Sequence, residues 1–577
     1  MSRGRALAAR GARAALALLA LAACGRPGRV VRQQDLLSDG RAARPARLLP
    51  YHCQDETHRS RYLRGGQALR RRIAVAGDAE LVVAACRDDP GGPPRALRLV
   101  LVGGDGEREV RVAPLGPGWQ EQRFDLRAWR GRDVALRLVV DAPPGEVVFL
   151  RDFALRSVRP APRPRAVPRA LLISLDTVRE DALGGAAATP VLDRLAGEAE
   201  RFTPHWAAEI STKPSHASML TGVPAALHGC DRQATPLAAA FDTVAERLAR
   251  AGVTTAAFAS QPTAFAPRFG LGQGFGEYRS EIWSSAQELR AAADFVGGHR
   301  DAPLFVFVHL FEAHSDTRRL PYESPGMTAA RVARRFGFPD YGCRGGACAS
   351  RLLLAMNRDR ALAPAPGEPA LLRALYEAGV ASLDRELGRF FADLRADGLW
   401  DDLLVILTAD HGEAFGEHGY FLHTTAHEEV LRVPLLVKWP RGRRAGSGAR
   451  GFSSSLDLAP TILARFGLPA ADLAGRDLAS EAPAARVLVS RDAVRVGDRK
   501  LLLATPEAPA ALYDLAADPG ERHDLLPGAP AEGERLRAVW ASFHAEAKRR
   551  LGAVRVAAPG TLTPGEIEHL RALGYLR

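Results

Sequence analysis

From residue 169 onward, short apolar runs alternate with longer stretches that have helical spacing. Each apolar run is short and continuous enough to be a buried strand: ALLISL, TTAAFAS, LFVFVHL, DLLVILT and VPLLVKW. The stretches between them repeat their apolar residues every three or four positions: PVLDRLAGEAERF, DTVAERLARAG and LYEAGVASLDRELGRFFADLRADG. This alternation predicts an α/β domain with a central, mostly parallel sheet.

Before residue 159 the pattern differs, because apolar residues alternate at strand period. The runs LRLVLVGG, ALRLVVDA and EVVFLRDFALRSV are separated by Gly/Pro-rich turns, which is typical of a β-sandwich. The Pro/Arg-rich RPAPRPRAVP that follows is typical of a linker. The predicted organisation is a signal peptide at 1–23, a linker at 24–50, a β-sandwich domain at 51–158, a linker at 159–168, a catalytic domain at 169–490 and a C-terminal subdomain with a tail helix at 491–577.

The N-terminal segment indicates export. Four arginines precede the apolar run AALALLALAA, which is far short of the ~20 residues that span a bilayer. The run ends in LAAC and resembles a bacterial lipoprotein signal, in which Cys24 would be lipidated. By the same resemblance, Gly25 favours the outer membrane. We therefore expect a lipid-anchored protein of the bacterial cell envelope, facing the periplasm or the surface.

The chain is basic, with a formal net charge of +12. Its arginines are scattered along the whole length, and no dense basic run interleaved with aromatic residues occurs. We therefore expect no nucleic-acid binding. A diffuse basic surface suits anionic surroundings such as lipopolysaccharide or acidic glycans.

Export permits disulfides, and an odd number of cysteines remains after Cys24, so at least one is free. The segment CRGGAC is predicted to close a loop between Cys343 and Cys348, and Cys53 could meet Cys86. A zinc site is the alternative, but no second CxxC-type pair accompanies CRGGAC.

Polar residues follow three of the predicted strands. Asp176 follows ALLISL, Glu312 and His314 follow LFVFVHL, and Asp410 and His411 follow DLLVILTA. In open α/β sheets the ligand crevice lies at the carboxyl ends of the strands, so these side chains are predicted to converge on one site.

The stretch EISTKPSHASMLTG contains the start of a predicted helix, and its first residues can be interpreted in two ways. Pro214 fits an early helical position, so Thr212 lies at the positive end of a helix dipole. Ser211 or Thr212 could simply cap this helix. Alternatively Thr212 is a nucleophile, and the acidic residue and Asp-His pair at the strand ends favour this second interpretation.

Hydrolysis of a sulfate ester or phosphoester requires an anionic centre to be neutralised and a nucleophile to be activated. One divalent metal bound by Asp176, Asp410, His411 and Thr212 would do both, since coordination lowers the pKa of a hydroxyl. The metal stays open among calcium, manganese, zinc and magnesium. The expected substrate is an anionic ester, either in a glycan or in a lipid headgroup.

The ordered motifs resemble the sulfatase branch of the alkaline phosphatase superfamily, from about residue 170 to the C-terminus. The motifs that carry the resemblance are SLDTVREDALG, TKPSHASMLTG, TADHGEAFGEHG, HEEVLRVPLLVKWP, RKLLL and LYDLAADPGERHDL. The resemblance implies an alkaline phosphatase-like α/β sandwich preceded here by the N-terminal β-sandwich domain.

Further site residues are carried over from this resemblance. His216 stands where the family has an arginine that helps hold the nucleophile, and Lys213 adds a cation beside it. His314 matches the histidine of the family's Asp-Pro-His segment, and His423 stands where many sulfatases have a catalytic lysine. Both histidines are candidate general acids, whereas a structural role is expected for two others, His418 and His427.

The sequence also departs from typical sulfatases. Thr212 cannot be oxidised to the formylglycine of the common type, Thr177 replaces the second aspartate of the usual pair, and ASQPTAF stands in place of a Lys-x-His segment. Two enzymatic interpretations follow: sulfate ester hydrolysis, and a phosphodiesterase, phosphonate monoester hydrolase or phospho-group transferase. A third is an inactive glycan-binding lipoprotein, because the N-terminal domain resembles galactose-binding-like modules.

Overall fold

The computed structural model describes residues 29–567 with gaps, of which the longest are 36–48 and 323–352. The chain divides into two units, Met1–Pro164 with Ala392–Leu399, and Arg165–Phe391 with Trp400–Arg577. The predicted signal peptide, the lipidated Cys24, the CRGGAC loop and the tail helix lie outside the described residues and stay predictions. Within the described residues, none of the helices combines the length and apolar character that a bilayer crossing needs.

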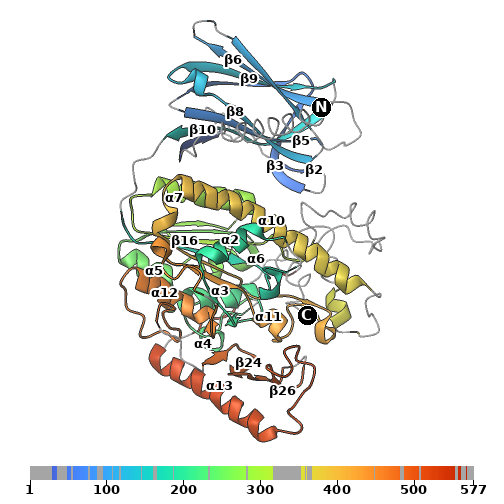
Figure 1. The fold of residues 1–577 in the computed structure, drawn as a ribbon, viewed down its shortest axis with the longest axis vertical. Helices are drawn as coiled ribbons and strands as arrows, with labels where there is room; N and C mark the ends of the chain where they lie inside the picture. The colour runs from blue at the N-terminus through green and yellow to red at the C-terminus, as the bar shows by residue number, and fades with distance from the viewer. Residues whose placement is uncertain are drawn as a thin grey trace, which may run out of the picture. The chain divides into compact units, whose positions relative to one another are not determined.

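The first unit contains two antiparallel sheets (Figure 1). One is built from β1 (Arg29–Asp35), β2 (Leu49–Cys53), β3 (Glu56–Arg64), β10 (Val147–Arg159), β5 (Asp78–Arg87) and β8 (Gly118–Asp125). The other is built from β4 (Ala68–Ala74), β9 (Asp133–Asp141), β6 (Arg95–Gly103) and β7 (Arg108–Leu115). Buried and exposed residues alternate along β9, and the buried residues of both sheets form one hydrophobic cluster. Cys86 of β5 is disulfide-bonded, and Cys230 of the second unit is a free buried thiol.

The second unit is built on an eight-stranded mixed sheet. In order across the sheet, the strands are β15 (Glu277–Arg279), β14 (Thr254–Ala259), β16 (Leu304–Leu310), β11 (Arg169–Leu175), β17 (Leu403–Thr408), β20 (Leu435–Lys438), β12 (Glu200–Phe202) and β21 (Ala449–Arg450). The strands from β15 to β17 are parallel, whereas β20 runs antiparallel to both neighbours. All five strands predicted from the apolar runs are confirmed, and so is the mostly parallel α/β sheet.

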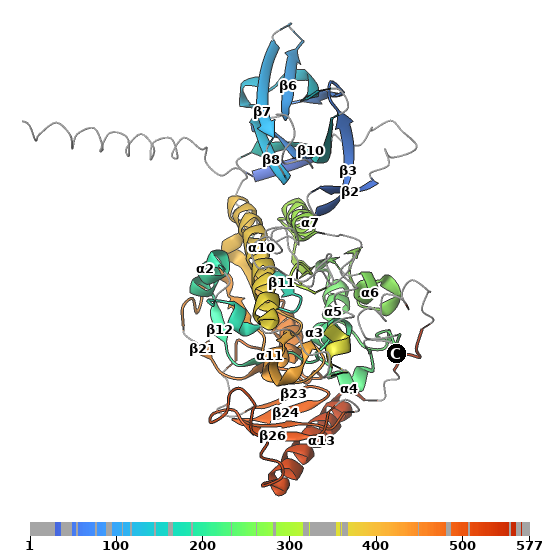
Figure 2. The same ribbon diagram turned by 90° about the vertical axis from the view of Figure 1, so that its right-hand side faces the viewer.

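Helices cover both faces of this sheet (Figures 1 and 2). On one face lie α2 (Pro190–Glu198), α7 (Ser285–Gly298) and α10 (Glu368–Ala396), and on the other lie α3 (Thr212–Thr221), α5 (Val244–Arg250) and α12 (Leu458–Arg465). The three predicted helices are confirmed, although α10 begins at Glu368, earlier than its sequence pattern suggested. The stretch predicted as the first helix is helical only to Glu198, because its last residues, Glu200–Phe202, form β12.

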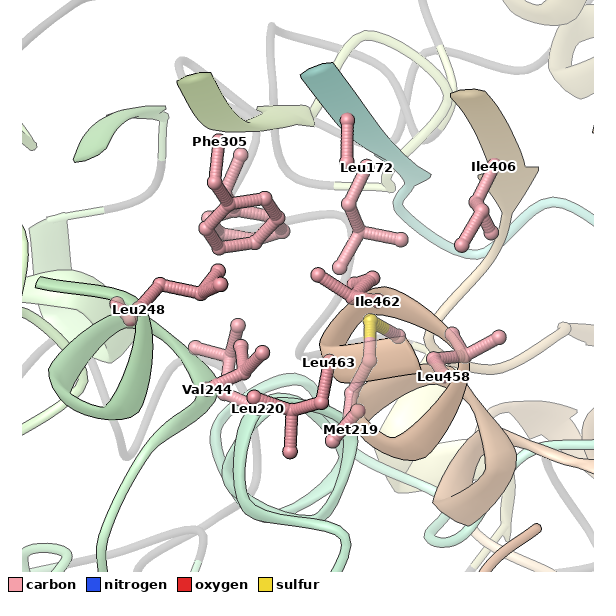
Figure 3. Close-up of a cluster of buried hydrophobic side chains, with 14 of the residues drawn as sticks. Leu172, Met219, Leu220, Val244, Leu248, Phe305, Ile406, Leu458, Ile462 and Leu463 are labelled. Carbon is pink, nitrogen blue, oxygen red and sulfur yellow. The ribbon is translucent and has the colours of Figure 1, made fainter. Parts of the chain in front are cut away.

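The core under the sheet holds α3 in place (Figure 3). Leu172, Phe305 and Ile406 point from three central strands toward Leu220 of α3 and Ile462 of α12. All five side chains are fully buried. Every residue of α3 is buried, the polar ones included. The helix that carries Thr212 is therefore a rigid part of the core.

The C-terminal part adds a four-stranded antiparallel sheet packed on α13 (Pro530–Leu551). Its strands are β23 (Val487–Val489), β24 (Ala493–Val496), β25 (Arg499–Leu502) and β26 (Ala511–Asp514). The buried Lys500 of β25 joins this sheet to α11 (Glu428–Leu431), because its Nζ lies 3.0 Å from Glu428 Oε1 and 2.8 Å from Glu521 Oε1.

A side chain of α10 caps the N-terminus of α2. The N-cap residue Thr189 makes no side-chain capping bond. Instead, Asp384 Oδ1 accepts hydrogen bonds from the backbone N–H groups of Val191 (3.1 Å) and Leu192 (2.8 Å). The carboxylate satisfies two N–H groups that a helix start leaves unpaired and fixes α2 to α10.

We expect Asp384→Ala to lower the free energy of unfolding by about 1–3 kcal/mol, because two buried N–H groups lose their acceptor. Asp384→Asn keeps an oxygen at the same place and should retain most of the stability. Thermal unfolding of the full chain measures both variants. Equal stability of Asp384→Ala and the unchanged protein would contradict this role.

Candidate active site

Two of the three acidic residues predicted from the strand ends converge, whereas Glu312 accepts a hydrogen bond from Ser285 of α7 (3.2 Å). Asp176 directly follows β11, and Asp410 follows its parallel neighbour β17, in which Thr408 pairs with Ser174. Asp176, Asp410 and His411 each offer a ligand atom within 4.8 Å of the others, and all three side chains are fully buried. Sheet topology thus brings together residues that lie more than two hundred positions apart in the sequence.

The turn after β11 is held in an unusual conformation. Thr177 is a β-branched residue with φ of 60°, in the left-handed region that such residues rarely adopt. Its backbone N–H donates to Asp410 Oδ1 (3.3 Å), and its carbonyl accepts from the hydroxyl of Tyr376 (3.1 Å). Its own hydroxyl donates to the carbonyl of Asp176 (2.7 Å). The residue in place of the family's second aspartate therefore shapes the turn and orients Asp410.

Thr212 is the first residue of α3, and its hydroxyl faces the acidic group. Its Oγ1 lies 3.4 Å from Nε2 of His411. The N-cap residue is Ser211, whose side chain makes no capping hydrogen bond. The interpretation of Ser211 as a conventional side-chain cap is therefore wrong, and Thr212 stands at the positive end of the helix beside the acidic residues.

His216 holds the nucleophile candidate from within the same helix. Its Nδ1 lies 2.7 Å from the carbonyl of Thr212, and its Nε2 lies 2.9 Å from Oγ of Ser174. Burial lowers the pKa of His216 to about 4, so the ring is neutral. Since a carbonyl only accepts, Nδ1 carries the hydrogen and Nε2 accepts from Ser174. The ring thus links the start of α3 to β11, which agrees with the local role predicted for His216.

Lys213, predicted as a cation beside the nucleophile, contacts Asp231 and Phe269. Its buried Nζ lies 3.9 Å from Asp231 Oδ1 and 4.1 Å from the centroid of the Phe269 ring. Burial lowers the pKa of this ammonium. These contacts direct its charge toward Asp231 and an aromatic face.

His423, predicted as a general acid, lies next to His411. The two ring centroids are 4.3 Å apart. Nδ1 of His423 lies 3.2 Å from Oε1 of the buried Glu413, so the carboxylate fixes which ring nitrogen bears the hydrogen. His314 follows at 5.5 Å from the His423 ring and stacks on Phe311 at 4.4 Å. The predicted histidines therefore lie beside one another, and the charge of His314 also acts to lower the pKa of Asp176, which burial raises.

His309 joins the site although the sequence analysis missed it. Its Nδ1 lies 3.2 Å from the carbonyl of Ser260, and its Nε2 lies 3.2 Å from Oδ2 of Asp176. Burial lowers the pKa of His309 to about 4, so Nδ1 donates to the carbonyl and Nε2 presents a lone pair. That lone pair faces a carboxylate oxygen, which is also an acceptor.

Several buried acceptor atoms of this site have no hydrogen-bond donor among the described residues. Both carboxylate oxygens of Asp176, Oδ2 of Asp410 and Nε2 of His309 lack hydrogen-bond partners among the described residues. Burial and the neighbouring Asp410 raise the pKa of Asp176 to about 7. Burial also opposes ionisation of Asp410, but His411 and the hydrogen bond from the Thr177 backbone hold its pKa below the ordinary value. Carboxylates and an imidazole whose lone pairs converge without a proton between them fit a divalent metal.

Three residues of the site were not predicted from the sequence: Ser174, His309 and Glu413. Ser174 and His309 are paired in register on β11 and β16. Each is a single polar residue near the carboxyl end of an otherwise apolar run, and that position was the available signal.

Comparison with known proteins supports the resemblance to sulfatases. The profile of the Sulfatase family matches residues 168–468. Human N-sulphoglucosamine sulphohydrolase is 29% identical over 299 residues, which is 49% of this chain and 57% of that protein. N-acetylglucosamine-6-O-sulfatase of Bacteroides thetaiotaomicron is 28% identical over 174 residues, or 26% of this chain and 31% of that protein.

A shorter stretch of 102 residues is 42% identical to the multifunctional alkaline phosphatase superfamily protein PehA of Trinickia caryophylli, and it covers 18% of this chain and 20% of that protein. Each of these matches spans less than two thirds of the relative. Among solved structures, phosphonate monoester hydrolase of Agrobacterium radiobacter superposes with a TM-score of 0.50 at 23% identity, covering 66% of this chain and 96% of that one, which shows a shared fold.

The family profile covers more than half of the chain, and residues of three of the ordered motifs meet at one buried site. The protein belongs to the sulfatase family of hydrolases.

Proposed function

We propose that this protein is a metal-dependent hydrolase that cleaves singly charged sulfate esters or phosphoesters with Thr212 as its nucleophile. One observation carries the proposal: the hydroxyl of Thr212 lies 3.4 Å from Nε2 of His411, beside buried carboxylate oxygens that lack partners among the described residues. When bound by Asp176, Asp410 and His411, a divalent metal supplies positive charge for the ester oxygens and lowers the pKa of the nearby hydroxyl.

The residues of α3 prepare the attack. Thr212 and the backbone N–H groups of the first helical turn lie at the positive end of the helix, where an anionic ester is favoured. His216 fixes the backbone of Thr212. In the first step, Oγ1 forms a bond to sulfur or phosphorus while the bond to the leaving oxygen breaks. In the second step, water cleaves the bond between Oγ1 and the sulfuryl or phosphoryl group.

His423 is the proposed donor of the proton to the leaving oxygen. Its contact with Glu413 holds Nδ1, so Nε2 is the nitrogen that would deliver the proton. Glu413 in turn stabilises the charged form of the ring. His314, whose ring lies beside that of His423, would assist in holding ester oxygens.

The use of Thr212 as nucleophile, in place of formylglycine, affects which substrates the enzyme can turn over. A formylglycine hydrate releases sulfate by collapsing to an aldehyde, and threonine cannot follow that route. Exit from the covalent intermediate then depends on water attacking sulfur or phosphorus, which phosphoester-cleaving enzymes with hydroxyl nucleophiles accomplish. The shared fold with a phosphonate monoester hydrolase agrees with this preference.

We also propose that the two antiparallel sheets of the first unit form a β-sandwich module. Their buried residues share one hydrophobic cluster, which is the arrangement expected of two packed sheets.

Replacement of Thr212 tests the nucleophile. We expect Thr212→Ala to lower kcat/KM at least about a thousandfold, because the attacking oxygen is lost, and Thr212→Ser to retain part of the activity. Ser211→Ala is the matched control and should keep near-normal turnover, since its side chain makes no capping bond. Turnover by Thr212→Ala equal to that of the unchanged protein would refute the assignment.

A panel of substrates tests the preference for singly charged esters. One divalent ion together with the protonated His423 ring balances one negative charge on the ester better than two. We expect phosphodiesters and phosphonate monoesters to be cleaved at least as well as aryl sulfates, and all of these better than phosphate monoesters. Steady-state rates with Thr212→Ala as the blank provide the comparison. Turnover confined to aryl sulfates would exclude the phosphoester preference.

Replacement of His423 tests the proton donor. We expect His423→Gln to reduce kcat by about a hundredfold or more for esters with poor, alkyl leaving groups. Nitrophenyl esters should be little affected because their leaving oxygen needs no proton. The slope of log kcat against leaving-group pKa measures the difference. The same loss with every leaving group would instead indicate a structural role.

A further inference from the structure

A second group of metal-ligating side chains lies outside the proposed catalytic set. His418, His427 and Glu429 each offer a ligand atom within 4.8 Å of the others. The two imidazole rings stack with centroids 3.8 Å apart and planes 8° from parallel, so one ring must turn out of the stack for both nitrogens to bind one ion. His418 Nε2 lies 3.6 Å from Glu429 Oε1. His418 comes from the short helix η6 (Glu417–Gly419), and the other two come from the start of α11.

The backbone and a neighbouring hydroxyl orient both imidazoles. His418 has φ of 54° and lies between Gly416 and Gly419, which also have positive φ, so a tight turn aims its ring. Nδ1 of His427 lies 3.0 Å from Oγ1 of Thr425. A hydrogen bond at one ring nitrogen leaves the other as a defined ligand atom, as is usual for histidines that bind metals.

Glu429 provides the strongest indication of a ligand. Its side chain is 8% exposed, and its Oε1 is buried with no hydrogen-bond partner among the described residues. Placing a carboxylate in such surroundings is unfavourable unless a cation or a donor meets it. The nearby Lys500 forms ion pairs with Glu428 and Glu521. Its positive charge is therefore balanced and would not repel a cation bound at Glu429.

We propose that His418, His427 and Glu429 bind a second divalent transition-metal ion, of which zinc is the best fit. Two imidazole nitrogens and one carboxylate oxygen are typical zinc ligands, whereas calcium and magnesium prefer oxygen alone. This site is independent of the metal proposed for Asp176, Asp410 and His411.

The second ion would support the loop that carries the catalytic residues. The backbone N–H of Glu413 donates to the carbonyl of Glu429 (3.1 Å), and that of Gly412 donates to the carbonyl of Val430 (2.7 Å). A Cβ added at Gly412 would lie 2.1 Å from the carbonyl oxygen of Glu429, so the two segments are in direct backbone contact. Fixing Glu429 therefore fixes the segment that follows His411. The ion acts as a structural clamp.

Zinc counting on the full chain tests this site. The protein is stripped with a chelator, given zinc chloride alone, freed of unbound metal and measured by mass spectrometry for zinc per chain. In the double variant Asp176→Asn/Asp410→Asn, which disables the catalytic set, we expect one zinc ion per chain. Adding His427→Gln should abolish that binding, while the exposed His299→Gln should leave it unchanged.

Thermal unfolding gives a second readout that does not depend on activity. Zinc should raise the unfolding temperature of the Asp176→Asn/Asp410→Asn protein and should have no effect once His427→Gln is added. If His427→Gln fails to fold without metal, Glu429→Gln takes its place.

Two results would overturn the second site: no zinc bound by Asp176→Asn/Asp410→Asn, or zinc binding that survives both His427→Gln and Glu429→Gln. Failure of the catalytic proposal gives a different pattern. In that case the unchanged protein and Asp176→Asn/Asp410→Asn bind the same single ion, and His427→Gln removes it from both.

Discussion

Two carboxylates, Asp176 and Asp410, are buried side by side at the ends of neighbouring parallel strands, and the rest of the site is arranged around them. Such a pair is stable only with compensating positive charge. The structure brings a helix N-terminus to it, and leaves carboxylate oxygens and one His309 lone pair without hydrogen-bond partners among the described residues. These features fit the divalent metal that we propose for this site.

The surrounding structure holds this unfavourable arrangement in place. Thr177 adopts a strained conformation that aims its N–H at Asp410, and Tyr376 of α10 braces that turn. His216 ties the start of α3 to β11, and every residue of the helix is buried. Strain and buried charge concentrate at functional sites because the surrounding packing outweighs their cost.

Much of this could be predicted from the sequence. Apolar runs and helical spacing identified the strands and helices, and the polar residues after β11 and β17 identified Asp176, Asp410 and His411. The contribution of His309 could not be predicted in the same way, because it depends on the register that pairs it with Ser174. The contacts of Lys213 with Asp231 and Phe269 depend on the direction of its side chain, which neighbours in space determine. Glu413 lay within a recognised motif, but its role requires the fold that brings His423 back beside it.

The central claim is that Thr212 attacks the ester and carries the transferred group. Acid quenching during turnover, followed by digestion and tandem mass spectrometry, tests this claim most directly. With a phosphodiester or phosphonate substrate, we expect a phosphoryl or phosphonyl group on the peptide from the start of α3, assigned to Thr212 and absent in Thr212→Ala. An adduct on another residue, or rapid turnover of the Thr212→Ala protein, would contradict the account.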